Sequence, residues 1–100
     1  MKISEKVDAE FINRAVFKIV DMLYEKEHMY KIGFLLLSGR DLKLESKIKY
    51  IDFLTGKIDG YIIEKKNEKA LIYTTLLRKR VNDILKDLKI AENFELNVAQ

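Results

Sequence analysis

The 100-residue sequence contains no cysteine, no proline and no tryptophan, and it has a single histidine. Without cysteine the chain can form neither a disulfide nor a thiolate metal site, and a reducing cytoplasm is the expected compartment. One histidine, His28, excludes a multi-histidine metal site, and no serine or cysteine nucleophile pattern lies near it. We therefore expect no metal, no cofactor and no enzymatic activity.

Long hydrophobic runs and glycine-rich loops are also missing. No uninterrupted apolar run exceeds four residues, as at Phe34–Leu37, and the first ten residues, MKISEKVDAE, are too charged for a signal peptide. These features predict no membrane association. The four glycines are too scattered to form a loop that cradles a phosphate, so we expect no small-molecule ligand. With 48% apolar and 35% charged residues, the composition predicts one globular domain over residues 1–100.

The formal charge of +3 is unevenly distributed along the chain. Residues 1–30 sum to −1 and residues 81–100 to −2, whereas residues 65–80 sum to +5. That segment contains one acid, Glu68, and six bases: Lys65, Lys66, Lys69, Arg78, Lys79 and Arg80. The concentration of positive charge favours a polyanionic partner.

The clearest helical pattern covers residues 8–27. Apolar residues recur there at three- and four-residue spacings, and Asp8 is placed to cap the first turn. Phe17, Val20 and Tyr24 widen the apolar surface beyond one stripe. This wider surface predicts either a broad core contact or a dimer face. His28 is expected in the polar break that follows, in an exposed loop or at a helix end.

Residues 30–54 have the pattern of a helix-turn-helix. The apolar segment Met29–Leu37 fits a buried strand or a short helix, and the break after it favours the helix, because Gly39 can end one helix and Asp41 can cap the next. A second helix is expected over Leu42–Leu54. A short helix, a tight glycine turn and a capped helix together predict this motif.

Residues 59–75 have the composition of a β-hairpin. Tyr61–Ile63 and Ala70–Thr75 predict two strands, and the turn between them contains Asn67, which tolerates positive φ. Thr74 or Thr75 is expected to cap a last helix over 76–90. Residues 91–100 are expected to form a short edge strand or a frayed tail. The fold class predicted is mainly α with a small β-hairpin (α+β), a winged helix-turn-helix.

Several short motifs of the chain resemble those of the small winged helix-turn-helix DNA-binding regulators of archaea, their viruses and plasmids. The resemblance is carried by Tyr50-Ile-Asp-Phe-Leu54, Gly60-Tyr-Ile62, Ile72-Tyr-Thr-Thr75 and Leu85. The turn Thr55–Gly60 is longer than the family pattern, and the usual glycine after the second wing strand is missing. The resemblance implies double-stranded DNA as partner, a role in transcription regulation, and a homodimer through the first and last helices.

The expected DNA contacts fall into two groups. Lys43, Ser46, Lys47 and Lys49 would lie on the recognition helix, and Lys65, Lys66 and Lys69 on the wing, with Arg78 just beyond it. Each group also fits an ordinary solvated surface. In the recognition helix, Glu45 and Asp52 reduce the net positive charge, and a charged tip is common on any exposed hairpin. The alternative function is a winged-helix module for protein–protein contact, or a subunit of a larger assembly, because the same fold serves both roles.

Overall fold

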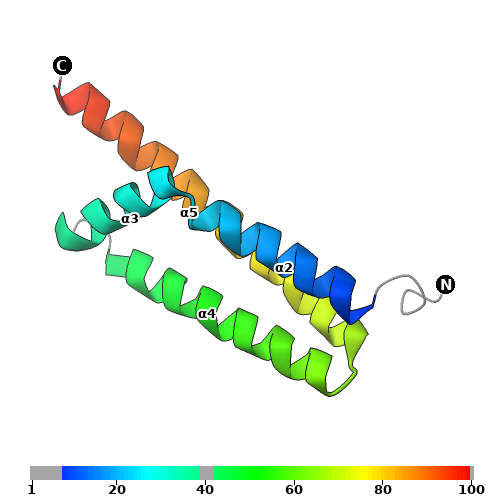
Figure 1. Ribbon diagram of the computed structural model, residues 1–100. Coiled ribbons are helices and arrows are strands. Elements are labelled where there is room, and N and C mark those ends of the chain that lie inside the picture. The colour runs from blue at the N-terminus through cyan, green and yellow to red at the C-terminus, as the bar shows by residue number, and fades with distance from the viewer. Residues whose placement is uncertain (1–7, 39–41, 100) are drawn as a thin grey trace.

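The computed structural model of the protein describes the backbone of residues 8–38 and 42–99, and the side chains of residues 8–38 and 43–88. These residues form four helices and no strand: α2 (Ala9–Leu23), α3 (Lys26–Ser38), α4 (Leu42–Ile63) and α5 (Asn67–Ala99). Figure 1 shows α5 lying beside both α2 and α4, with α2 and α5 pointing in the same direction and α4 in the opposite one. The molecule measures 55 × 21 × 20 Å.

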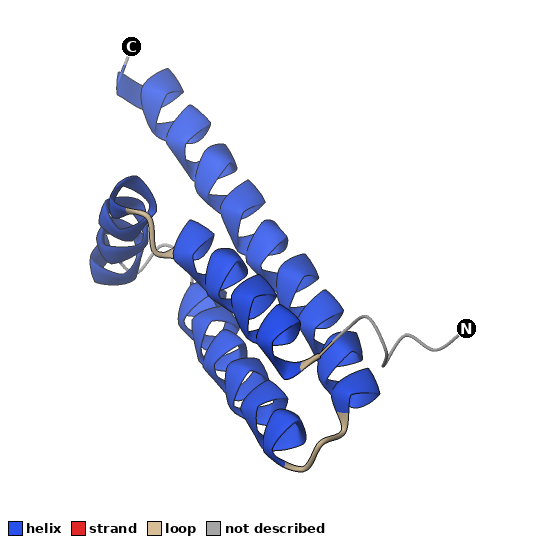
Figure 2. Cartoon of the chain, turned by 45° about the vertical axis from the view of Figure 1, so that its right-hand side comes forward, coloured by secondary structure: helices blue, strands red, loops and turns tan. Residues whose placement is uncertain are grey.

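The core lies between α2, α4 and α5, and α3 closes the end where α4 begins (Figure 2). Buried residues of α3, α4 and α5 recur mainly at three- or four-residue spacings, and in α2 the half-buried Val16 and Ile19 continue this spacing between the buried Ile12 and Leu23. The buried apolar side chains are Ile12, Leu23, Ile32, Leu35, Leu44, Ile51, Leu54, Ile58, Ala70, Leu77, Val81, Ile84 and Leu88.

The start of α2 confirms the expected cap. The Asp8 carboxylate accepts a 2.8 Å hydrogen bond from the backbone N–H of Phe11, which satisfies one of the free donors of the first turn. The helix ends at Leu23, before the predicted residue 27. His28 lies in the first turn of α3, where its Nδ1 donates a 2.8 Å hydrogen bond to the carbonyl of Met22. The histidine therefore joins the two helices.

The predicted β-hairpin over 59–75 is wrong, and with it the α+β winged-helix fold class. Residues up to Ile63 belong to α4, and residues from Asn67 onward belong to α5. The reason lies in burial: Ala70, Thr74, Leu77 and Val81 are buried at spacings of four, three and four, which only a helix places on one side. Strand-type composition is a context-dependent preference, and packing against α4 and α2 outweighs it.

The caps and turn residues expected for the hairpin are corrected as well. Thr74 and Thr75 lie inside α5, where their hydroxyls donate to the carbonyls of Ala70 and Leu71, at 2.7 and 3.2 Å. Asn67 starts α5, and the residue with positive φ is Lys65, at 62°. The turn expected over Thr55–Gly60, with its glycines Gly56 and Gly60, lies within α4.

The remaining boundaries differ in the same direction, towards longer helices. The second helix of the predicted helix-turn-helix continues past Leu54 to Ile63. The last helix begins at Asn67 instead of residue 76, and it includes residues 91–99, for which an edge strand or frayed tail was predicted. The segment Met29–Leu37 is helical, as the break after it suggested, within α3. Gly39 and Asp41 lie outside the described residues.

A three-residue connection joins α4 to α5 and ends α4 with a left-handed residue. The N–H of Lys65 bonds to the carbonyl of Ile62 at 3.0 Å, and the N–H of Lys66 bonds to that of Tyr61 at 2.8 Å. This pair of bonds is the Schellman motif, in which the left-handed position normally holds glycine. A lysine there carries a steric penalty from its Cβ.

We expect Lys65→Gly to raise the free energy of unfolding by about 1 kcal/mol, because glycine removes that penalty. Urea denaturation followed by circular dichroism measures the change. Lys66→Gly is the matched control, since Lys65 is the one non-glycine residue with positive φ in the described chain. Equal effects of the two substitutions would contradict the assignment of strain to Lys65.

Candidate nucleic-acid interface

The residues predicted to contact DNA lie at opposite ends of α4. Lys43, Ser46, Lys47 and Lys49 belong to its first turns, whereas Lys65 and Lys66 follow its last residue and Lys69 lies in the first turn of α5. About 30 Å of helix separates Lys43 from Ile63 at a rise of 1.5 Å per residue. The two predicted groups therefore do not form one compact surface.

Among the residues that the structure describes, carboxylates lie beside Lys47, Lys49 and Lys66. Lys47 bonds to Asp87 of α5, Lys49 lies 3.3 Å from Glu45, and Lys66 lies 3.3 Å from Glu64. The Glu45 and Glu64 pairs are well exposed, and such surface pairs contribute little to stability. The Lys47–Asp87 pair is less exposed and connects α4 with α5.

The three cations near the middle of α5 point in different directions. Arg78, Lys79 and Arg80 are consecutive, and successive side chains on a helix are turned by about 100°. Arg80 faces α4, where its guanidinium carbon lies 5.6 Å from the centroid of the Tyr50 ring. It also pairs with Asp83 at 4.0 Å. Arg78, which was predicted to contact DNA, is exposed and does not join this contact.

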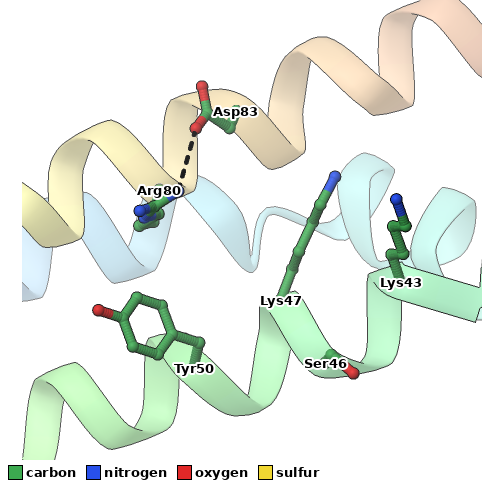
Figure 3. A pocket seen from close by; sticks show the side chains of 6 residues that line it. All are labelled: Lys43, Ser46, Lys47, Tyr50, Arg80 and Asp83. Atoms are coloured by element: carbon green, nitrogen blue, oxygen red, sulfur yellow. Dashed lines mark ion pairs between the residues drawn. The ribbon is translucent and has the colours of Figure 1, made fainter.

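A groove lies between the first half of α4 and the middle of α5, with a volume of about 310 Å³. Figure 3 shows Lys47 extending from α4 towards α5, with Tyr50 on α4 below Arg80 and Asp83 of α5. The groove combines three of the predicted recognition-helix residues, Lys43, Ser46 and Lys47, with one cation of α5, Arg80. Its lining residues are Lys43, Ser46, Lys47, Tyr50, Arg80 and Asp83.

Two tyrosines meet where the same two helices approach the turn. The rings of Tyr61 and Tyr73 lie edge to face, with centroids 5.2 Å apart. A hydrogen bond with Tyr61 raises the pKa of Tyr73, and the neighbouring Tyr61 and burial add to the rise, while Lys57 and Lys69 oppose it. Both lysines are therefore close to the tyrosine pair, and the Nζ of Lys69 lies 5.8 Å from the Tyr61 ring centroid.

Lys57 also lies over an aromatic ring, that of Phe53, one turn earlier in α4. Tyr50 and Phe53 stack with ring centroids 5.9 Å apart, and the Nζ of Lys57 lies 5.7 Å from the Phe53 centroid. Contacts of this kind hold a flexible side chain near one position while its charge stays at the surface. Lys57, Lys69 and Arg80 are thus each held beside an aromatic ring.

These contacts define one continuous surface, which we call the α4–α5 seam. It carries five cations and two carboxylates, together with three tyrosines, and the carboxylates belong to the half farther from the turn. Its members are Lys43, Lys47, Tyr50, Lys57 and Tyr61 of α4, and Lys69, Tyr73, Arg80, Asp83 and Asp87 of α5. Cations interleaved with aromatic rings are the usual chemistry of nucleic-acid binding.

Sequence reasoning did not find Lys57, Tyr61 and Tyr73 as candidates. Lys57 was assigned to a turn and the two tyrosines to strands, so their common surface was not visible. The signal is present once α4 is taken as one helix, because Lys43, Lys47, Tyr50, Lys57 and Tyr61 follow one another at intervals of three, four or seven residues.

Other types of site find no support in the part of the chain that the structure describes. No group of three or more His, Cys, Asp or Glu side chains there could hold a metal ion. None of the helices within the described ranges combines the length and apolarity needed to cross a membrane.

No family model, curated protein or solved structure matches the chain. The residues that carried the resemblance to winged-helix regulators lie on α4 and α5, without the strands that define a wing. The geometry and charge of the helices are therefore the basis for any functional assignment.

Proposed function

We propose that the protein binds double-stranded DNA through its phosphate backbone, using the α4–α5 turn and the part of the α4–α5 seam that extends from the turn to Arg80. One observation carries the proposal, the concentration of charge at this end of the molecule. Residues 57–80 contain seven Lys or Arg against three Asp or Glu, a net +4, so the other residues sum to −1. Because α4 and α5 run side by side here, these residues gather at one end of the body.

The arrangement of the cations supports contact with an extended polyanion. Lys69 and Arg80 lie on the same side of α5, about 16 Å apart along the helix. Lys57 lies across from them on α4, near Tyr73. Cations spaced along two neighbouring helices can follow successive phosphates of a DNA strand.

The α4–α5 turn also supports the proposal, because it holds a charged residue at a position where glycine would make the protein more stable. Lys65 occupies a left-handed position that glycine would fill with less strain. Backbone strain that a simple substitution would relieve is frequently found at functional sites. A lysine at the tip of the turn adds positive charge at an exposed position of the proposed surface.

Backbone contacts position a protein on DNA without reading its sequence. We therefore propose general duplex binding, in which the seam and turn supply electrostatic attachment and the neighbouring aromatic rings hold the cations in place. A small duplex-binding protein of this kind would act in the cytoplasm in the regulation of transcription.

The test is an anisotropy titration of a labelled random-sequence duplex. For five phosphate contacts, we expect affinity to fall about 500-fold between 50 and 200 mM salt, because bound counterions are released on binding. The triple variant Lys57→Glu, Lys69→Glu, Arg80→Glu should bind about 100-fold more weakly at low salt, since it reverses three contacts. Absence of detectable binding by the unmodified protein at low salt would refute the proposal.

The matched control is Arg14→Glu, Lys18→Glu, Lys26→Glu, which makes the same change in net charge on exposed residues of α2 and α3. We expect it to weaken binding by less than about 5-fold, through long-range electrostatics alone. Equal losses in the two variants would show that net charge, and not the seam, governs binding. Tighter binding of a single strand than of the duplex would contradict the assignment of the ligand.

The protein-interaction alternative is favoured by a different observation, the exposed apolar side chains of α3. This surface lies at the end of the molecule away from the α4–α5 turn.

A further inference from the structure

Helix α3 exposes an apolar stripe on the side facing away from the core. Tyr30, Phe34 and Leu37 are exposed to 71%, 50% and 91%, at spacings of four and three residues. The buried residues of the same helix, Ile32 and Leu35, lie on its opposite side. Leu37 is the most exposed large apolar side chain among the described residues.

The exposed area is large for a protein of this size. Met29 and Leu36, at 43% and 41% exposure, extend the stripe on one flank. Taking roughly 200 Å² for a large apolar side chain, the five residues expose about 600 Å² per molecule, at the upper end for a typical monomer.

Gly33 lies in the middle of the stripe and has no role in the packing of its own chain. A Cβ built on it would meet nothing within 4 Å. Glycine inside a helix is less stable than alanine, because it restricts the unfolded chain less. A small residue between large exposed ones creates a hollow into which a side chain of another helix can fit.

The order of large and small residues along the stripe allows it to pack against the stripe of a second copy of the chain. If two copies of α3 pack antiparallel about a two-fold axis between Gly33 and Phe34, Tyr30 lies opposite the partner's Leu37. Phe34 then lies opposite the partner's Gly33. Large residues meet at the ends and a ring meets a hollow in the middle, as an isologous interface requires.

We propose that α3 is a homodimer interface, with two copies packed antiparallel through Tyr30, Gly33, Phe34 and Leu37. With Met29 and Leu36 on its flank included, two such faces would bury about 1,200 Å², the lower limit for a specific, stable interface. The occupant is a second copy of this chain, because the complementarity is between the stripe and its own two-fold image. The interface differs from the first-and-last-helix dimer that the family resemblance implied, since α2 and α5 pack against each other within one chain.

Sedimentation equilibrium of the unmodified protein between 1 and 100 µM should show a dimer. Tyr30→Glu with Leu37→Glu should raise the dissociation constant at least 100-fold, because it places like charges in an apolar contact. Phe17→Glu with Ile72→Glu is the matched control, since these residues are 71% and 66% exposed outside α3, and it should leave the dimer intact. A monomer at 100 µM, or a dimer that survives the α3 substitutions, would overturn the proposal.

A cross-link tests the orientation without relying on destabilised contacts. The chain lacks cysteine, so Tyr30→Cys with Leu37→Cys introduces the only thiols. The antiparallel arrangement predicts that mild oxidation links this variant into covalent dimers, whereas Tyr30→Cys alone stays largely unlinked. Equal linking of the single and double variants would overturn the antiparallel register, and a monomer that binds anionic vesicles through α3 would assign the surface to lipid instead.

Discussion

Replacing Ile58 with alanine is expected to lower the free energy of unfolding by about 2–5 kcal/mol. Ile58 is completely buried within α4 and belongs to the core shared with α2 and α5. Truncation removes buried apolar surface and leaves a cavity that the neighbouring helices fill only in part. At about 5 °C per kcal/mol for a domain of this size, the melting temperature should fall by more than 10 °C.

Ile63→Ala is the matched control, because the same residue type lies five positions later in α4 with 80% of its surface exposed. Its truncation should change stability by no more than about 0.5 kcal/mol. The comparison also separates the helical fold from a winged helix, in which Ile58 would lie in the turn Thr55–Gly60. Equal small effects of the two substitutions in urea denaturation would contradict a continuous α4.

Replacing Ile72 with proline should cost about 3 kcal/mol or more. Ile72 lies within α5, so proline removes its backbone hydrogen bond and its ring clashes with the carbonyl one turn earlier, at Glu68. The Ile72 side chain is 66% exposed, so little packing is lost and the effect comes from the backbone. Thermal denaturation and the loss of the far-ultraviolet helical signal measure it.

Ile72→Ala provides the control for this position. In an exposed helical position alanine is the better helix former, so stability should stay unchanged or rise by a few tenths of a kcal/mol. In the predicted strand Ala70–Thr75 the same change would reduce stability, because isoleucine is preferred in strands. A clear destabilisation by alanine would therefore favour the hairpin over the helix.

Part of the candidate interface could be predicted from the sequence. The excess of lysine and arginine over residues 65–80 is visible without coordinates, and Lys65, Lys66 and Lys69 do lie together at the turn. The sequence did not reveal that Lys57 lies near Tyr73, or that Arg80 meets Tyr50, because those pairs form only where α4 and α5 pack side by side.

The first half of the chain was the more predictable half. Asp8 caps α2 as expected, and the three- and four-residue spacing of its apolar residues identified the helix. Local signals were sufficient there, because a capping side chain and an amphipathic period act within a few residues. In α4 the buried residues Leu44, Ile51 and Leu54 follow at intervals of seven and three residues, in agreement with the helix predicted over Leu42–Leu54.

By itself the sequence determined the composition, the local helical periods and the concentration of positive charge towards residues 57–80. The tertiary structure alone decided whether 59–75 is a hairpin or the junction of two helices. Residues such as Tyr61, Ile62, Ile72 and Tyr73 suit strands by composition, and their spacing also fits a helix. The choice depends on burial of Ala70, Thr74 and Leu77 against partners far away in the chain, and that contribution is absent from any local window.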